Sequence, residues 1–261
     1  MTFDSAQPSN SPRCTDSILP GTENLSLPEQ LRLLTSIWDS LDRKQQQRFL
    51  QEPGNELASS IVDALYWMQH ATKTKDEQDQ ANPYKPFPDY HYFKTLHYLW
   101  QTEPVLFVEK SRTMMVSWFA AAETLHAVMK GQPAKGIFWA QDEDRAIALL
   151  DYAWVLYEQQ IEQMKTLYPL DRPRNRQNYR SMELADGGIL LALPGKDPNK
   201  IRSEHPTILV MDECCFIENG GEAFDIAISS RVPKVVCVSS AAPSWFRRLT
   251  KSAVHEELPE V

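Results

Sequence analysis

Residues 105–117 read VLFVEKSRTMMVS, in which four apolar residues lead into a short polar segment with one lysine. The apolar run at 105–108 predicts a buried strand, and the Ala-rich segment at 118–129 predicts a helix. A strand, a short loop and a helix in this order direct backbone N–H groups and a helix N-terminus at an anion. We therefore predict a phosphate-binding loop, made of Lys110, Ser111, Arg112, Thr113, Met114, Met115, Val116 and Ser117.

The lysine of this loop is displaced. Such loops usually carry a lysine directly before the final Ser or Thr, but here that position is Val116. The only lysine is Lys110, at the start of the loop, and its long side chain could reach the β- and γ-phosphates of a nucleotide from the other side. The hydroxyl of Ser117 would then reach Mg²⁺. The alternative is an ordinary strand, turn and helix with a surface lysine.

A second apolar run, at 208–211, ends in two carboxylates, Asp212 and Glu213. This is the form of a Walker B strand, in which the first acid helps to hold Mg²⁺ through its water shell and the second orients the attacking water. Doubly wound sheets bind ligands at the carboxyl ends of their strands, where the loop and the acidic pair would both lie. Together they predict a catalytic Glu213 and a metal-side Asp212, although an exposed turn after a strand is the alternative for either alone.

The remaining pattern is typical of an α/β fold. Apolar runs at 137–140 and 235–238 and a helical pattern at 143–167 alternate as strands and crossover helices of a parallel sheet do. Residues 181–193 predict a strand pair that turns at 186–188. We expect a mainly parallel central sheet with helices on both faces.

The chain is expected to have four parts. Residues 1–25 are rich in Ser, Pro, Thr and Asn and predict a flexible tail. Residues 26–82 predict a small helical subdomain, which begins with a capping box at Ser26 and ends in a polar linker at 72–82. Residues 83–250 then form the nucleotide-binding domain, and 251–261 begin a linker.

Composition limits the classes of function. The chain of 261 residues has a formal charge of −8, so it is not covered with DNA-binding charge and any nucleic-acid contact must be local. Its four cysteines show neither metal-ligand nor disulfide spacing and fit a reducing cytoplasm. No apolar run approaches the roughly 20 residues that span a bilayer, so no membrane contact is expected.

The loop resembles that of the large subunit of bacteriophage and prophage terminases, whose form is Lys-[Ser/Ala]-Arg-Gln-x-Gly-x-[Ser/Thr]. The resemblance covers most of residues 85–250. Two positions depart from it, because Thr113 stands where Gln is usual and Met115 where Gly is usual. Glycine accepts a positive φ at little cost, whereas methionine there would cost on the order of 1 kcal/mol.

The resemblance implies a P-loop ATPase of the additional-strand, helicase- or RecA-like type. Its cofactors would be ATP and Mg²⁺, and it would power the packaging of double-stranded DNA into a procapsid. The implied partners are a portal protein, a small terminase subunit and further copies of the chain, in a ring that is expected to be a pentamer on the procapsid and a monomer when isolated. The implied location is the cytoplasm of the infected bacterial host. A full-length large subunit would continue into a nuclease domain, so no nuclease activity is expected of this chain.

The resemblance also implies roles for residues outside the loop. Ser239 and Ser240, which end the strand at 235–238, would sense the γ-phosphate as a coupling motif, with a polar turn before Pro243 as the alternative. Arg202 would reach the nucleotide of a neighbouring subunit, or else pair with Glu204 or Glu213 in its own. The candidates for an adenine pocket are Phe87, Tyr90, Phe93, Trp100 and Gln101, although most of them are expected to be core.

One basic cluster stands out in the acidic chain. Arg172, Arg174, Arg176 and Arg180 are expected to face DNA, and a solvated loop is the alternative. Two further functions remain open for the whole chain. One is a helicase-like ATPase that remodels nucleic acid, although helicases of that type keep Gly-Lys before the final Ser or Thr. The other is a non-enzymatic assembly module, which Met115 and Val116 would favour.

Overall fold

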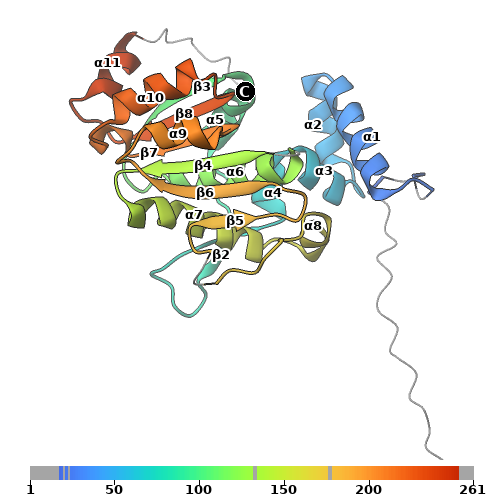
Figure 1. The fold of residues 1–261 in the computed structure, drawn as a ribbon. Helices are drawn as coiled ribbons and strands as arrows, with labels where there is room; N and C mark the ends of the chain where they lie inside the picture. The colour runs from blue at the N-terminus through green and yellow to red at the C-terminus, as the bar shows by residue number, and fades with distance from the viewer. Residues whose placement is uncertain (1–17, 20, 23, 132–133, 176–177, 253–261) are drawn as a thin grey trace, which may run out of the picture. The chain divides into compact units, whose positions relative to one another are not determined.

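The computed structural model describes residues 18–19, 21–22, 24–131, 134–175 and 178–252 (Figure 1). Most of the expected flexible tail at 1–25 and of the expected linker at 251–261 lies outside the described residues. The chain divides into two compact units between Val62 and Asp63. This division lies at residue 62, whereas the sequence placed the end of the helical subdomain near residue 82.

The first unit contains three helices, α1 (Leu27–Ser40), α2 (Arg43–Gln51) and α3 (Glu56–Val62). As the capping box requires, the side chain of Glu29 accepts hydrogen bonds from the backbone and the hydroxyl of Ser26, at 2.8 and 2.6 Å. A second capping box begins α2 at Asp42. Both α1 and α2 contact α3, and the rings of Trp38 and Phe49 meet edge to face at 5.9 Å.

The second unit is built on a six-stranded sheet with the order β3-β8-β7-β4-β6-β5. Its strands are β3 (Val105–Glu109), β4 (Lys135–Ala140), β5 (Ser181–Glu183), β6 (Ile189–Pro194), β7 (Ile208–Asp212) and β8 (Lys234–Ser239). All neighbouring pairs are parallel except β5 and β6. The predicted α/β class with a mainly parallel sheet is confirmed. The strand β8 lies between β3, which leads into the loop, and β7, which ends in the acidic pair. It is the additional strand that the expected fold class requires.

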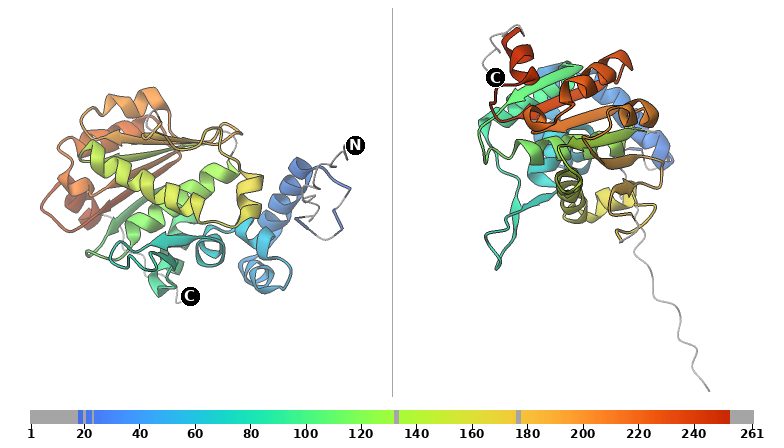
Figure 2. Two further views of the ribbon diagram at one scale, coloured as in Figure 1. Left: turned by 90° about the horizontal axis from the view of Figure 1, so that it is seen from below. Right: turned by 60° about the vertical axis from the view of Figure 1, so that its left-hand side comes forward.

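Helices cover both faces of this sheet (Figures 1 and 2). On one face, the helices α9 (Asn199–Glu204), α10 (Gly220–Ser229) and α11 (Trp245–Ser252) share a buried cluster with alternate residues of β4, β7 and β8. On the other face, α6 (Val116–Lys130) and α7 (Glu143–Glu158) contact β4 and β6. Because both faces are covered, β7 and β8 are continuous apolar runs, as the sequence predicts.

The predicted helix at 143–167 is two helices, α7 and α8 (Glu162–Leu167). The break occurs because the N–H of Ile161 donates to the carbonyl of Ala71, at 2.9 Å, instead of continuing the α-helical ladder. The side chain of Gln160 is buried there and accepts a hydrogen bond from Trp67. The strand pair at 181–193 is confirmed, and its turn uses a positive φ of 92° at Gly187.

The helical pattern that the sequence shows at 57–68 is also interrupted. Asp63 ends α3 and caps α4 (Ala64–His70) by accepting from the N–H of Tyr66, at 2.7 Å. The expected linker at 72–82 contains β1 (Lys73–Lys75), which pairs antiparallel with β2 (Tyr84–Pro86). The helix α5 (His91–Thr102) then leads to the first strand of the large sheet.

A buried charged triad joins three helices of the second unit. His97 of α5 contacts Glu123 of α6 through Nδ1, at 2.6 Å, and Asp63 at the start of α4 through Nε2, at 3.2 Å. Their side chains are 15%, 1% and 12% exposed, in that order. Burial alone would lower the pKa of His97, but the charges and hydrogen bonds of Glu123 and Asp63 outweigh it and raise the pKa from 6.5 to about 10.

Replacing this histidine should destabilise the protein in a pH-dependent way. Because the folded state holds a proton on His97 that the unfolded state releases, its contribution is complete below pH 6.5 and is lost as the pH rises through about 10. We expect His97→Gln to lower the free energy of unfolding by roughly 3–5 kcal/mol near pH 6. Denaturant titrations across pH 6–10 should show this difference shrinking as pH rises. A difference that is constant over this range would contradict the charged triad.

Candidate functional site

The predicted site residues gather where β3, β8 and β7 end. The three strands are parallel neighbours, with Glu109 opposite Ser239 and Val238 opposite Asp212. The N–H of Lys110 donates to the carbonyl of Ser239, at 3.0 Å, and so extends the pairing by one residue into the loop. The loop, the acidic pair and the serine pair, which are far apart in the sequence, therefore meet at one edge of the sheet.

The loop between β3 and α6 has the geometry of an anion cradle. Thr113 and Met115 both have positive φ, at 65° and 52°, and α6 begins directly after them. No backbone N–H from Ser111 to Ser117 finds a hydrogen-bond partner among the described residues. Donors without partners, next to a helix N-terminus, form the environment that binds phosphate oxygens. The loop therefore fits the phosphates of a nucleotide.

The conformation expected at Met115 is present, because this residue is in the left-handed region. Glycine would take that conformation at little cost, so the methionine carries the strain that the sequence predicts there. A residue missed by sequence reasoning supports the loop: the hydroxyl of Tyr92 donates to the carbonyl of Met114, at 2.7 Å. No pattern in the sequence marks Tyr92 for this contact.

Ser117 and Asp212 face each other across the site. The hydroxyl of Ser117 lies 3.1 and 3.0 Å from the two carboxylate oxygens of Asp212. Burial raises the pKa of Asp212, and it outweighs the charge of Lys110 and the hydrogen bond from Ser117, which lower it. A hydroxyl and a carboxylate at this spacing are hard oxygen donors of the kind that Mg²⁺ accepts, alone or through its waters.

Lys110 and Glu213 form an ion pair, with Nζ 2.7 Å from Oε1 and side chains that are 10% and 26% exposed. Glu213 also accepts from the backbone N–H of Ser240, at 3.1 Å, and from its hydroxyl, at 3.2 Å. Burial would raise the pKa of Glu213, but these hydrogen bonds and the charge of Lys110 together lower it. Glu213 is therefore ionised at neutral pH and can polarise a water molecule.

The two serines after β8 have different contacts. Ser239 is fully buried, and its hydroxyl accepts from the N–H of Cys215, at 3.2 Å. Ser240 is bonded to Glu213 as described above. The pair therefore connects the end of β8 to both the first and the third residue after Asp212.

Within the described chain, no group of three or more His, Cys, Asp or Glu side chains is arranged to hold a metal ion. A nucleotide-bound Mg²⁺ does not need one, because it takes one or two protein ligands together with phosphate oxygens and waters. Ser117 and Asp212 are the residues of this site that could supply such ligands.

Arg202 lies exposed on α9 and makes no ion pair with any residue described by the structure. The two carboxylates that sequence reasoning offered as its own-subunit partners are both occupied by lysines. Glu204 pairs with Lys135, at 3.1 Å, and Glu213 pairs with Lys110. The alternative of an internal ion pair for Arg202 is therefore not found.

The arginine cluster expected to face DNA is exposed but neutralised in part. Arg172 pairs with Asp171, at 3.2 Å, Arg174 with Asp151, and Arg180 with Glu143. Arg174 also lies over the ring of Trp154, 5.6 Å from its centroid. Arg176 lies outside the described residues. The DNA contact of this cluster stays a prediction. Phosphates that bind these arginines would have to compete with the carboxylates.

Most of the aromatic residues considered for an adenine pocket belong to the core. Phe87, Phe93 and Trp100 are buried, as expected. Tyr90 is 45% exposed and stacks on Tyr92, at 5.4 Å between ring centroids. Tyr92, which was not among these candidates, contacts the loop, so Tyr90 is connected to the loop through its stacking on Tyr92.

No described helix is long and apolar enough to cross a membrane. Neither a protein-family model nor a curated protein matches the sequence. The matches among solved structures include some with TM-scores below 0.5. Two of these are the large terminase ATPase domain of Thermus phage P74-26 (TM-score 0.47, 15% identity, 67% of this chain and 74% of that chain) and the N-terminal domain of the DNA packaging ATPase from bacteriophage phi29 (TM-score 0.42, 16% identity, 62% and 85%).

The large terminase of bacteriophage HK97 matches with a TM-score of 0.55 and 11% identity. The match covers 74% of this chain and 41% of that chain. At a sequence identity this low, the structural match shows a shared architecture but not a shared activity. Over most of its length, the chain therefore has the fold found in the HK97 large terminase.

Proposed function

We propose that this chain is the ATP-hydrolysing motor domain of a phage-type terminase large subunit, which drives double-stranded DNA into a procapsid. The observation that carries the proposal is a pair of contacts across β8, from Lys110 to Glu213 and from Ser117 to Asp212. Each contact joins one residue of the loop to one residue of the acidic pair, so the groups that ATP hydrolysis requires lie next to one another. The architecture shared with the HK97 large terminase supports the same proposal.

In this proposal the loop holds the phosphates of ATP through its unpaired N–H groups. Ser117 and Asp212 would hold Mg²⁺, which would supply positive charge to neutralise the phosphate oxygens. Lys110 leaves Glu213 for the β- and γ-phosphates, because a phosphate carries more charge than one carboxylate. Glu213, kept ionised and still held by Ser240, orients the attacking water. Ser240 thereby links the presence of the γ-phosphate to the end of β8.

The assembly is part of the proposal. The motor works as a homo-oligomeric ring, of five copies, with the portal protein and the small terminase subunit in the cytoplasm of the infected host. The proposed role of Arg202 is to stabilise charge on the transferring phosphoryl group of the neighbouring subunit. Its exposure and its lack of an ion pair within the described residues support this role.

A helicase-like ATPase is a less suitable interpretation, because the loop lacks Gly-Lys before Ser117. An assembly module without nucleotide is favoured only by Met115 and Val116. The strain at Met115 is on the order of 1 kcal/mol, which corresponds to less than about tenfold in affinity. Calorimetric titration with ATP and Mg²⁺ tests the assembly-module interpretation, since the motor proposal requires binding at or below roughly millimolar nucleotide.

Removing the lysine should abolish hydrolysis. We expect Lys110→Ala to lose turnover and to bind ATP roughly 10–100-fold more weakly, because one charge-assisted contact to phosphate disappears. Steady-state hydrolysis and calorimetry measure the two effects. Lys94→Ala is the matched control, since Lys94 is an exposed lysine of α5. Hydrolysis by Lys110→Ala at the parental rate would show that the displaced lysine does not act on phosphate.

Removing the charge of Glu213 should separate binding from turnover. We expect Glu213→Gln to keep nucleotide binding and to lower the hydrolysis rate by about 10²–10⁴-fold, because the amide can still accept from Ser240 but cannot polarise water as a carboxylate does. Glu218→Gln, at an exposed glutamate five residues later, is the control. The assignment fails if Glu213→Gln loses binding while turnover per bound nucleotide is unchanged.

The role of Arg202 can be tested by mixing variants. If Arg202 acts across subunits, hydrolysis per subunit should rise with protein concentration or on assembly. Rings that mix Arg202→Ala with Glu213→Gln should then recover part of the activity that each variant lacks alone, because some interfaces contain both intact groups. Assembled mixed rings with no recovery would leave Arg202 as a local structural residue.

A further inference from the structure

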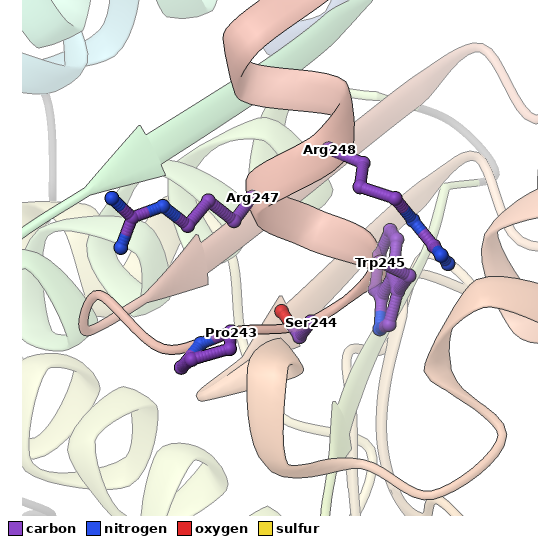
Figure 3. Close-up of a pocket in the computed structure, with 5 residues that line it drawn as sticks. All are labelled: Pro243, Ser244, Trp245, Arg247 and Arg248. Atoms are coloured by element: carbon purple, nitrogen blue, oxygen red, sulfur yellow. The ribbon is translucent and has the colours of Figure 1, made fainter.

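The chain that follows the serine pair forms a pocket at the start of α11 (Figure 3). The pocket has a volume of about 420 Å³ and is lined by Pro243, Ser244, Trp245, Arg247 and Arg248. Arg247 and Arg248 extend to opposite sides of α11 in Figure 3. Two arginines and a tryptophan therefore line one hollow, only a few residues after Ser240.

Arg247 and Arg248 are exposed, and neither forms an ion pair with any carboxylate among the described residues. Arg172, Arg174 and Arg180 differ from them, because each of these has a carboxylate partner. In a chain with a formal charge of −8, two adjacent arginines that have no acidic partner in the described part of the chain form a local positive centre.

We propose that Trp245, Arg247 and Arg248 form a contact for the phosphate backbone of double-stranded DNA. The inference rests on the proposed function, and it names the surface to which the DNA of that function would bind. Arginine suits this role because its planar fork of donors matches phosphate oxygens, and because a phosphate here displaces no carboxylate of the described residues. Backbone contacts of this kind carry no sequence information.

Hydrogen bonds join the pocket directly to the residues that follow Glu213, where β7 ends. The indole Nε1 of Trp245 donates to the carbonyl of Cys214, at 3.2 Å, and the hydroxyl of Ser244 donates to Sγ of Cys215, at 3.1 Å. Trp245 also packs against Gly220 and Gly221, where a Cβ on Gly220 would come within 2.7 Å of the indole nitrogen. Cys214 and Cys215, which follow Glu213, therefore contact Trp245 and Ser244 at the start of α11.

These contacts connect the serine pair with the arginines. Ser240 bonds to Glu213, and the residues that follow Glu213 bond to Ser244 and Trp245. If a nucleotide that displaces Glu213 or Ser240 changes DNA affinity at the arginines, bound DNA must change nucleotide affinity by the same factor, because coupling free energy is reciprocal.

The test is a salt series of DNA binding with charge-matched variants. A short fluorescent duplex is titrated with the wild-type chain, with Arg247→Gln/Arg248→Gln, and with the control Arg48→Gln/Arg231→Gln, which removes the same charge from exposed arginines of α2 and of the turn before β8. We expect Arg247→Gln/Arg248→Gln to weaken binding by about tenfold or more and to reduce the salt slope by roughly 2. The control should match the wild type, and a second duplex of unrelated sequence should give the same result.

Several outcomes would overturn the inference. These are a wild-type chain that binds no duplex, a variant with unchanged affinity and slope, and an equal loss in the control. Weaker ATP binding with unchanged DNA binding would also overturn it, because the arginines would then contact nucleotide. Circular dichroism of each variant verifies folding, and Arg248→Lys, which keeps the charge, should retain most of the slope.

Calorimetry with ATP and Mg²⁺ on the same preparations separates this inference from the proposed function. Lys110-dependent ATP binding together with unchanged DNA binding in Arg247→Gln/Arg248→Gln overturns the inference and leaves the motor proposal standing. A wild-type chain that binds DNA through these arginines but binds no nucleotide overturns the motor proposal and leaves the DNA contact.

Discussion

The spacing of three parallel strands is the constraint on which the site depends. Because β8 lies between β3 and β7, the loop and the acidic pair are separated by two strand spacings, roughly 10 Å. A lysine side chain spans much of that gap, so Nζ of Lys110 reaches Glu213 from the first residue after β3. Ser117, the second residue of α6, lies close to Asp212. In a sheet in which β3 and β7 were direct neighbours, the loop and the acidic pair would be only one strand spacing apart.

The pKa values of the two adjacent carboxylates at this end of the sheet are shifted in opposite directions. Burial raises the pKa of Asp212, whereas Lys110 and Ser240 together hold the pKa of Glu213 below its ordinary value. A neighbouring cation such as Mg²⁺ would favour the charged form of Asp212, and Glu213 is charged without it. The difference arises from position: Asp212 is the last residue of β7, whereas Glu213 follows it with a left-handed backbone at φ 48° that turns its side chain toward Lys110 and Ser240.

Ion pairs divide the exposed arginines into two groups. Arg172, Arg174 and Arg180 each have a carboxylate partner. Arg202 on α9 and the two arginines of α11 have no such partner among the described residues. Positive charge is therefore available to an outside anion on these two helices, although the net charge of the chain alone would predict none.

The sequence by itself determined the class of fold and the parts of the site that lie within one continuous stretch. The runs at 105–108, 137–140, 208–211 and 235–238 are strands because a buried parallel strand must be apolar throughout, and Met115 has the left-handed backbone that its place in the loop predicts. Only the tertiary structure decided the breaks at Asp63 and Gln160, whose side chains bond to partners far away in the sequence, and the contact of Tyr92 with the loop. It alone decided which arginines are neutralised. Local periodicity reports how one segment is buried, whereas an ion pair depends on which distant segment folds against it, and that information is not contained in either segment.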